Sequence, residues 1–222
     1  MGKVITETTF SPVQQTVFDS FAKDKNLSQK FYFTGGTALS AVYLHHRESE
    51  DLDFFSESDF DNDGIIKFID NIASLINTRS RVTLKERVRI FELVDDDKNL
   101  VIKIDFGYYP HSRLKKGKRL QGVDVDSLID ISANKITTIL QRTDIKDFVD
   151  LYFLLKKYTV WDLLHWSQKK FNMEIDLVWL ASGFLKVEKF DYLPKMLVPL
   201  KLSDLQAFYK DLARKIGDSF LR

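Results

Sequence analysis

The sequence predicts an α+β protein in which a β-rich first domain, residues 1–125, is followed by a helical second domain, residues 126–222. Short apolar runs of β type alternate with helical stretches before residue 125, whereas the apolar positions after it recur with helical spacing. Of the 222 residues, 44% are hydrophobic and 13% are aromatic. This composition supplies enough apolar material for packed cores and excludes a wholly disordered chain.

Each expected element of the first domain has a local signal. Ser11-Pro12 predicts a helix start, with serine as the N-cap and proline at the first helical position, and an apolar stripe extends from there to about Lys25. Phe31–Phe33 predicts a strand that ends at a pair of glycines. The other expected elements are a helix over 37–44, a strand over 52–55, a helix over 64–76, and strands over 81–86, 89–94 and 101–106.

The second domain is expected to be a helical bundle, because its apolar residues recur every three or four positions. The expected helices cover 127–142, 145–157, 161–171, 175–183 and 203–221.

Charge and composition exclude several classes of protein. Lys and Arg number 33 and Asp and Glu number 32, so the net charge is +1 and any nucleic-acid site must be local. The chain has no cysteine, which removes disulfides, thiol nucleophiles and thiolate metal sites and fits the reducing cytoplasm. No apolar run approaches the length of a transmembrane helix, so we expect no membrane partner.

A glycine turn between a predicted strand and a predicted helix is a candidate phosphate site. Gly35 and Gly36 have no Cβ atom, so the backbone there can approach a ligand closely. The N–H groups of a helix N-terminus favour a phosphate, and Thr37 adds a hydroxyl. The pattern therefore indicates binding of a phosphorylated ligand.

Two aspartates follow on the next predicted strand. Asp51 and Asp53 are two residues apart, and side chains alternate across a strand, so both carboxylates point to one face. Hard oxygen ligands of this kind suit Mg²⁺. Asp105 is a third candidate, because a charged residue between Ile104 and Phe106 is costly unless it is satisfied.

The three carboxylates converge if the Asp105 strand lies beside the Asp51–Asp53 strand. Three carboxylates can hold two metal ions about 3.5–4 Å apart, an arrangement that serves in-line phosphoryl transfer. We therefore expect a two-ion Mg²⁺ site.

These motifs together resemble the nucleotidyltransferase superfamily. They are Gly35-Gly36-Thr37-Ala38-Leu39, Arg47-x-Ser49-x-Asp51-x-Asp53 and the isolated Asp105. Within that superfamily the chain resembles the AbiEii/AbiGii-type toxin family. The helical signature of that family is similar to Ala133-Asn134-Lys135, Gln141-Arg142 and Lys146-Asp147-Phe148-Val149-Asp150-Leu151-Tyr152. The resemblance covers roughly residues 30–156.

The resemblance implies a mixed sheet with flanking helices, joined to a helical domain that completes the active-site cleft. It implies transfer of a nucleoside monophosphate from an NTP, with pyrophosphate released. Members of that family act as toxins beside a cognate antitoxin, and some modify tRNA 3′ ends, so the expected acceptor is RNA. The implied triphosphate contacts are Gly35, Gly36 and Ser49; the implied metal ligands are Asp51 and Asp53; Asp105 is the third carboxylate and the candidate base, and Lys135 neutralises phosphate charge.

Other interpretations of single features stay open. Lys135 and Arg142 are seven residues apart on one helix face, where they could instead form a solvated face or pair with Asp147 and Asp150. The only dense basic run, His111–Arg119, could hold an RNA backbone, with Tyr108 and Tyr109 stacking a base, or could be a solvated loop.

Rival functions belong to other classes. A non-catalytic nucleotide- or RNA-binding module on the same fold is one, and nucleotide transfer onto a protein hydroxyl is another. A third is a calcium-binding interaction protein, because Asp59, Asp61, Asp63 and Gly64, with Asp70 further on, match the spacing of a calcium loop. The alternative for that stretch is an acidic helix start.

Overall fold

The structure, a computed structural model, describes residues 9–218 and divides the chain into two compact units. The first unit contains the chain up to Tyr43 together with Ser49–Ser127. The second contains Leu44–Glu48 and the chain from Leu128 onwards. Five residues from the first half of the sequence thus belong to the helical unit.

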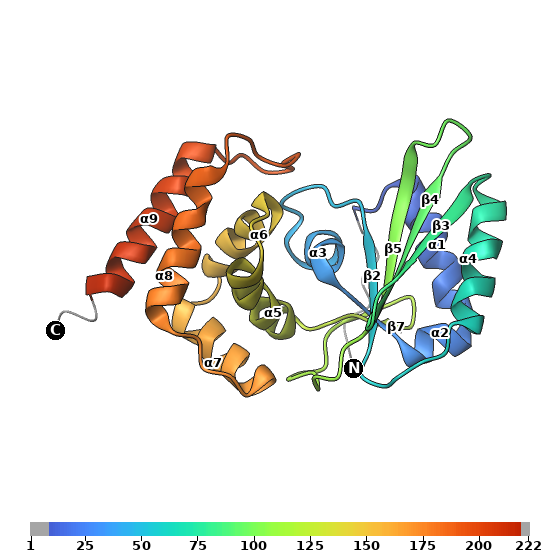
Figure 1. The fold of residues 1–222 in the computed structure, drawn as a ribbon, viewed down its shortest axis with the longest axis horizontal. Coiled ribbons are helices and arrows are strands. Elements are labelled where there is room, and N and C mark those ends of the chain that lie inside the picture. Colours follow the sequence, from blue (N-terminus) through green and yellow to red (C-terminus); the bar gives the residue numbers. More distant parts are fainter. Residues whose placement is uncertain (1–8, 219–222) are drawn as a thin grey trace. The chain divides into compact units, whose positions relative to one another are not determined.

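A five-stranded mixed sheet forms the centre of the first unit (Figure 1), with strand order β1-β2-β5-β4-β3. The strands are β1 (Tyr32–Thr34), β2 (Leu52–Ser56), β3 (Arg79–Leu84), β4 (Val88–Val94) and β5 (Leu100–Tyr108). β2 and β5 are parallel, and the other neighbouring pairs are antiparallel. The expected strands are therefore all present and form one sheet.

Three helices cover one face of this sheet, as Figure 1 shows, and they are α1 (Pro12–Lys23), α2 (Lys25–Lys30) and α4 (Asp63–Leu75). Ser11 caps α1 in a capping box with Gln14, which confirms the expected start. Beneath these helices the aromatic residues of alternate strand positions form the core. Phe21 of α1 stacks on Phe54 of β2, with ring centroids 3.9 Å apart.

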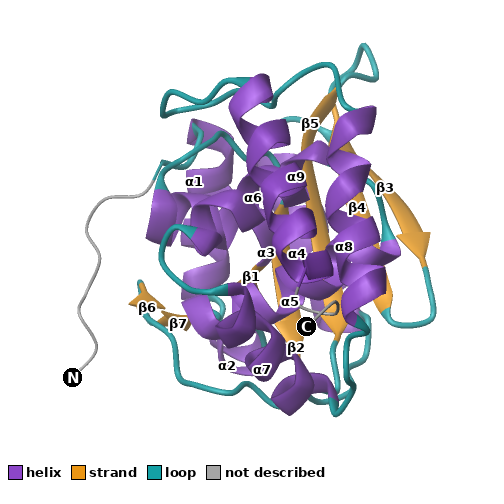
Figure 2. Cartoon of the chain, turned by 90° about the vertical axis from the view of Figure 1, so that its left-hand side faces the viewer, coloured by secondary structure: helices purple, strands orange, loops and turns teal. Residues whose placement is uncertain are grey.

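A short helix follows the glycine pair between β1 and β2. It begins as α3 (Gly35–Ala38) and continues as a π-helix, η1 (Leu39–Leu44). A helix was expected there, although starting two residues later. Two small elements had no sequence signal, namely α2 and a hairpin of β6 (Arg119–Leu120) and β7 (Val123–Asp124), which Figure 2 draws apart from the main sheet.

The second unit is helical, as expected. Its elements are α5 (Leu128–Gln141), α6 (Ile145–Leu155), α7 (Val160–Phe171), α8 (Leu177–Leu185), the 3₁₀ turn η2 (Lys186–Lys189) and α9 (Leu202–Asp218). The side chains of Asp144, Thr159 and Asp176 accept backbone N–H groups at the starts of α6, α7 and α8. The expected last helix extended to 221, and residues 219–221 lie outside the described residues.

A single apolar core holds these helices together, and in it Tyr209 of α9 donates a hydrogen bond of 2.7 Å to the carbonyl of Phe148. Within residues 9–218, no helix combines the length and the apolar character needed to cross a lipid bilayer.

Candidate active site

Asp53 and Asp105 lie side by side on one face of the sheet. They are register partners on the parallel strands β2 and β5, so their side chains point the same way. The next pair along, Phe54 and Phe106, points to the other face and is fully buried in the core. The alternation predicted from the sequence is therefore present, and it aims both carboxylates away from the core.

The ammonium group of Lys103 lies between the carboxylates of Asp51 and Asp105. Lys103 precedes Asp105 by two residues on β5 and shares its face. Its Nζ atom is 2.8 Å from Oδ2 of Asp105 and 3.6 Å from Oδ2 of Asp51. Across residues 9–218, no three carboxylate or imidazole side chains gather at metal-binding geometry. In this arrangement the ammonium of Lys103 stands where a cation could bridge Asp51 and Asp105.

The environment of Asp105 shifts its protonation. Burial raises the pKa of Asp105 above its ordinary value, and the negative charge of Asp51 adds to the effect. The hydrogen bond from Lys103 acts in the opposite direction. Oδ1 of Asp105 is buried and has no hydrogen-bond partner in the described part of the chain. A buried carboxylate oxygen of this kind is a ready ligand for a cation.

The glycine turn touches the carboxylate face directly. Gly35 has φ +76°, in the left-handed region that favours glycine. A Cβ atom built on Gly35 would lie 1.9 Å from Oδ2 of Asp53. Glycine is therefore required at this position for two reasons, the left-handed backbone and the lack of space for a Cβ atom. The start of α3 lies against the carboxylate of Asp53.

We predict that Gly35→Ala will abolish activity of the site while destabilising the first unit only modestly. The matched control is Gly122→Ala, because Gly122 has φ +87° and no atom within 4 Å of an added Cβ. Both variants should lose about 1–2 kcal/mol for a left-handed alanine. Only Gly35→Ala must also displace Asp53, so binding of a phosphorylated ligand such as an NTP, measured by calorimetry, should be lost in that variant alone. Equal affinities of the two variants for that ligand would contradict this assignment.

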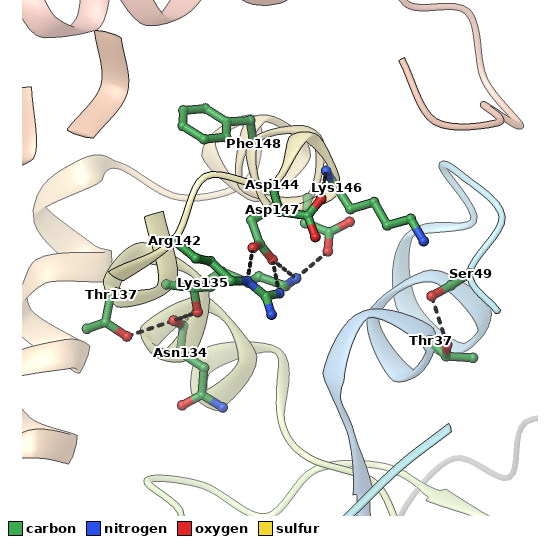
Figure 3. Close-up of polar contacts among 12 residues, drawn as sticks. Thr37, Ser49, Asn134, Lys135, Thr137, Arg142, Asp144, Lys146, Asp147 and Phe148 are labelled. Atoms are coloured by element: carbon green, nitrogen blue, oxygen red, sulfur yellow. Dashed lines mark hydrogen bonds and ion pairs between the residues drawn. The ribbon is translucent and has the colours of Figure 1, made fainter. Parts of the chain in front are cut away.

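The hydroxyl groups of Thr37 and Ser49 hold the backbone at Asp51 next to the glycine turn. The hydroxyl of Thr37 donates to the backbone carbonyl of Asp51, and its oxygen lies 2.8 Å from Oγ of Ser49 (Figure 3). From α1, the buried Gln14 donates to the carbonyl of Ser49 over 2.7 Å. These hydroxyls join the glycine turn to Asp51, the residue that precedes β2.

Lys135 belongs to the second unit, where two carboxylates hold it. Its Nζ atom lies 2.7 Å from Oδ1 of Asp147 and 2.6 Å from Oδ2 of Asp150. Arg142 binds Asp147 with Nε and Nη2, at 2.6 Å and 3.0 Å (Figure 3). Lys135 and Arg142 thus pair with these aspartates, as one of the interpretations of the sequence expected.

Arg47 completes this charge cluster from a distant part of the sequence. Its guanidinium is only 2% exposed and binds Asp150 with two parallel hydrogen bonds of 2.7 Å and 2.9 Å. Nε2 of His46 lies 2.8 Å from the same carboxylate. The backbone N–H of Glu48 donates to the carbonyl of Lys195. These contacts anchor the 44–48 segment in the helical unit, shortly before Asp51 in the sequence.

Sequence reasoning missed Lys103 and Arg47 as site residues. Lys103 had a usable signal, because it is two residues from Asp105 on the same strand and alternation puts both on one face. Arg47 belongs to the motif Arg47-x-Ser49-x-Asp51-x-Asp53, but no neighbouring residue in the sequence indicates that its side chain is buried. Its partner, Asp150, is 103 residues away.

The basic run proposed as an RNA contact lies in the loop after β5, and much of its charge is paired. Arg113 lies 3.1 Å from Glu57, and Arg119 lies 3.1 Å from Asp124. Lys118 donates to a backbone carbonyl over 3.1 Å. Arg113 and Lys118 fasten the loop to other parts of the first unit, and Arg119 pairs within the β6–β7 hairpin, so the run as a whole is not a solvated polycation.

The stretch that matches a calcium loop acts as a helix start. It follows strand β2, whereas a calcium loop of the EF-hand type needs an incoming helix. Oδ1 of Asp59 accepts the N–H of Phe60, and Oδ1 of Asp61 accepts the N–H of Asp63. Both carboxylates thus serve local turns ahead of α4, as in the acidic helix-start interpretation.

Comparison with solved structures identifies the class of fold. A structure described as "putative nucleotidyltransferase from H. pylori" superposes with a TM-score of 0.58 and 21% identity, over 92% of this chain and 93% of that one. JHP933 from Helicobacter pylori gives a TM-score of 0.56 at 20% identity, over 92% and 90%. The fold is thus the expected α+β arrangement of a mixed sheet with flanking helices.

Sequence comparison then gives the family. The profile described as "Nucleotidyl transferase AbiEii toxin, Type IV TA system" matches residues 18–215, so the chain belongs to this family of nucleotidyltransferases. The resemblance inferred from the motifs is confirmed. A protein of Aquifex aeolicus (strain VF5), "Uncharacterized protein aq_aa25", is 35% identical over 137 residues. That match covers 60% of this chain and 61% of the length of the relative.

Proposed function

We propose that this protein is a Mg²⁺-dependent nucleotidyltransferase that moves a nucleoside monophosphate from an NTP to an acceptor hydroxyl. The observation that carries the proposal is the pairing of Asp53 with Asp105 on one sheet face, with the Gly35 turn pressed against it. Membership of the AbiEii family supports the same reaction.

The carboxylates fit the proposed metal by their chemistry. Asp51, Asp53 and Asp105 offer hard oxygen ligands, and Oδ1 of Asp105 is buried without a hydrogen-bond partner in the described part of the chain. Together they would hold Mg²⁺, with room in the donor set for two ions. Bound Mg²⁺ would offset the negative charge of the transferring phosphoryl group and of the leaving pyrophosphate. Lys103 would then release Asp51 and Asp105.

The remaining residues bind and orient the reactants in this proposal. The backbone N–H groups of Gly35 and Gly36 hold the triphosphate, with the hydroxyls of Thr37 and Ser49 beside them. Asp105 accepts the proton of the attacking hydroxyl. A bond forms between the acceptor oxygen and the α-phosphorus, the bond between the α- and β-phosphates breaks, and pyrophosphate leaves.

Lys135, a residue of α5, is proposed to neutralise phosphate charge. Because Asp147 and Asp150 hold its ammonium, Lys135 must give up one of these carboxylates to reach a phosphate. Arg142 can compensate Asp147 when that happens.

The acceptor is proposed to be RNA, namely a tRNA 3′ end, and the protein the toxin of a cytoplasmic toxin–antitoxin pair. The printed description of the family names a type IV toxin–antitoxin system, which supports a cognate antitoxin as partner. Transfer onto a protein hydroxyl is the main alternative. A non-catalytic module on this fold is disfavoured, because the chain keeps all three carboxylates.

The test uses purified protein, Mg²⁺, total tRNA and each α-³²P-labelled NTP in turn, with the Asp51→Ala/Asp53→Ala double variant beside the wild type. Label should enter RNA with the wild type alone, and the productive NTP identifies the nucleotide. Label that enters only a protein acceptor would reassign the acceptor. Neither label transfer nor NTP binding would refute the enzyme proposal.

A further inference from the structure

The sheet face that bears the carboxylates continues as an aromatic surface. On β2, Phe55 follows Asp53 by two residues, and on β5, Gly107 follows Asp105 by two residues. Phe55 and Gly107 are themselves register partners. With alternating side chains and a rise of about 3.3 Å per residue, the Phe55 position is roughly 7 Å beyond Asp53 on the same face.

Because Gly107 has no side chain, the ring of Phe55 can pack directly against the backbone of β5. A Cβ atom at Gly107 would lie 2.7 Å from Cδ1 of Phe55, so any other residue would push the ring away. The ring of Tyr109 lies 5.4 Å from that of Phe55, and the ring of His111 lies 5.0 Å from that of Tyr109. We call Phe55, Tyr109 and His111 the aromatic strip. All three side chains are half-buried, which leaves part of each ring in solvent.

Two exposed cations lie in the turn beside the end of β5. Lys85 and Arg87 lie in the turn between β3 and β4, and both are solvent-exposed. The backbone carbonyl of Arg87 accepts the N–H of Tyr108, which places this turn beside the end of β5. The positive charge of Lys85 also acts to lower the pKa of Asp105, so this lysine influences the carboxylate face too.

We propose that the aromatic strip and the Lys85–Arg87 turn bind the single-stranded 3′ end of the acceptor RNA. The bases stack on Tyr109 and Phe55, and the backbone phosphates lie against the two cations. The inference rests on the proposed function, because the strip leads to the carboxylates where the terminal hydroxyl would react.

The length of the strip favours RNA over the base of the incoming NTP. A single base needs one ring to stack on, whereas three rings follow one another from Phe55 to His111. The turn Lys85-Glu86-Arg87 adds two cations and one carboxylate, so its net charge of +1 is local to this end of the sheet. Stacking platforms beside basic side chains are typical of sites for single-stranded nucleic acid.

The direct test is fluorescence anisotropy of a labelled, short single-stranded RNA with the full-length protein, in EDTA and without NTP. Tyr109→Leu should raise the Kd for RNA about tenfold, the loss expected for one stacked base. Tyr192→Leu is the matched control, since Tyr192 is 59% exposed in the second unit and should leave the Kd unchanged. Lys85→Ala/Arg87→Ala should flatten the salt dependence by about two phosphate contacts.

A second measurement does not depend on any variant. RNA that contains 4-thiouridine near its 3′ end is cross-linked to the wild-type protein, and the modified peptides are mapped by mass spectrometry. Cross-links to Phe55 or Tyr109 are expected. Cross-links confined to other peptides, or an unchanged Kd for Tyr109→Leu, would overturn the proposal. So would a loss of NTP affinity without a loss of RNA affinity, because the strip would then be a nucleotide-base site.

The proposal for the aromatic strip and the proposed function can be refuted independently of each other. If RNA binding depends on Tyr109 but no NTP yields label transfer, the strip stands and the proposed function is wrong. If label enters RNA with unchanged efficiency in Tyr109→Leu, the function stands and the strip is not the acceptor site.

Discussion

Replacing Asp53 with asparagine is expected to lower nucleotidyl transfer by about a thousandfold or more, without unfolding the protein. Asparagine keeps the size of the side chain, so it can still lie against Gly35. It removes the negative charge that would hold the metal beside Asp105. The rate of label transfer and the melting temperature should be measured on the same preparation, and the melting temperature should change little.

Glu92→Gln is the matched control for this variant. Glu92 is a carboxylate on β4 and the register partner of Lys103, so it lies on the same sheet face but outside the proposed metal site. Its neutralisation should leave the rate close to that of the wild type. A wild-type rate in Asp53→Asn, or an equal loss in Glu92→Gln, would contradict the assignment of the metal ligands.

Replacing Asp150 with alanine is expected to destabilise the second unit by about 3–5 kcal/mol, the effect of leaving buried charges without their partner. Asp150 is fully buried, and its carboxylate accepts from Arg47 and pairs with Lys135. Both cations are also buried, at 2% and 7% exposure. Lys135 would keep Asp147, but Arg47 would lose both of its hydrogen bonds to the Asp150 carboxylate.

Tryptophan fluorescence during urea unfolding measures this effect in the right unit. The chain has 3 tryptophans, Trp161, Trp166 and Trp179, and all belong to the second unit. Asp211→Ala is the control, because Asp211 makes ion pairs on α9 that are exposed to solvent and screened by it. A midpoint for Asp150→Ala as high as that of Asp211→Ala would show that the cluster does not stabilise the unit.

The charge cluster around Asp150 also makes the stability of the second unit depend on pH. Burial alone would raise the pKa of Asp150, but Lys135 and Arg47 lower it well below the ordinary range. A carboxyl group whose folded pKa is lowered contributes stability above its unfolded pKa and loses that contribution as the pH falls. The difference between the wild type and Asp150→Ala should therefore be constant from about pH 5 to 8 and shrink below about pH 4.

Local alternation explains why the common sheet face of Asp53 and Asp105 could be predicted. Asp105 lies between apolar neighbours on a strand, and only its combination with the glycine pair and with Asp51 and Asp53 indicated a functional face. The condition on which that argument depended, that the Asp105 strand lies beside the Asp53 strand, is met by the pairing of β2 with β5. The same argument applied to Lys103 would have found the cation beside Asp105, because the two residues occupy alternate positions of one strand.

The elements that were not predicted from the sequence are too short, or depend on residues too far away, to leave a signal in the local sequence. α2 (Lys25–Lys30) is a six-residue helix, and β6 and β7 are two residues each, which is too short for periodicity to appear. The 44–48 segment joins the second unit through Asp150 and Lys195, both far along the chain. Long-range pairing of this kind is determined by tertiary packing, and no window of sequence contains it.

The central claim is that the carboxylate face transfers a nucleotidyl group, and the most direct measurement compares α-³²P- with γ-³²P-labelled NTP under identical conditions. With Mg²⁺ and the productive acceptor, the α-label should move to the acceptor and the γ-label should appear in pyrophosphate. Transfer of the γ-label to the acceptor would indicate a kinase. Release of the γ-label as free phosphate, with the α-label left in a nucleoside diphosphate, would indicate a hydrolase. Either result would contradict nucleotidyl transfer by Asp51, Asp53 and Asp105.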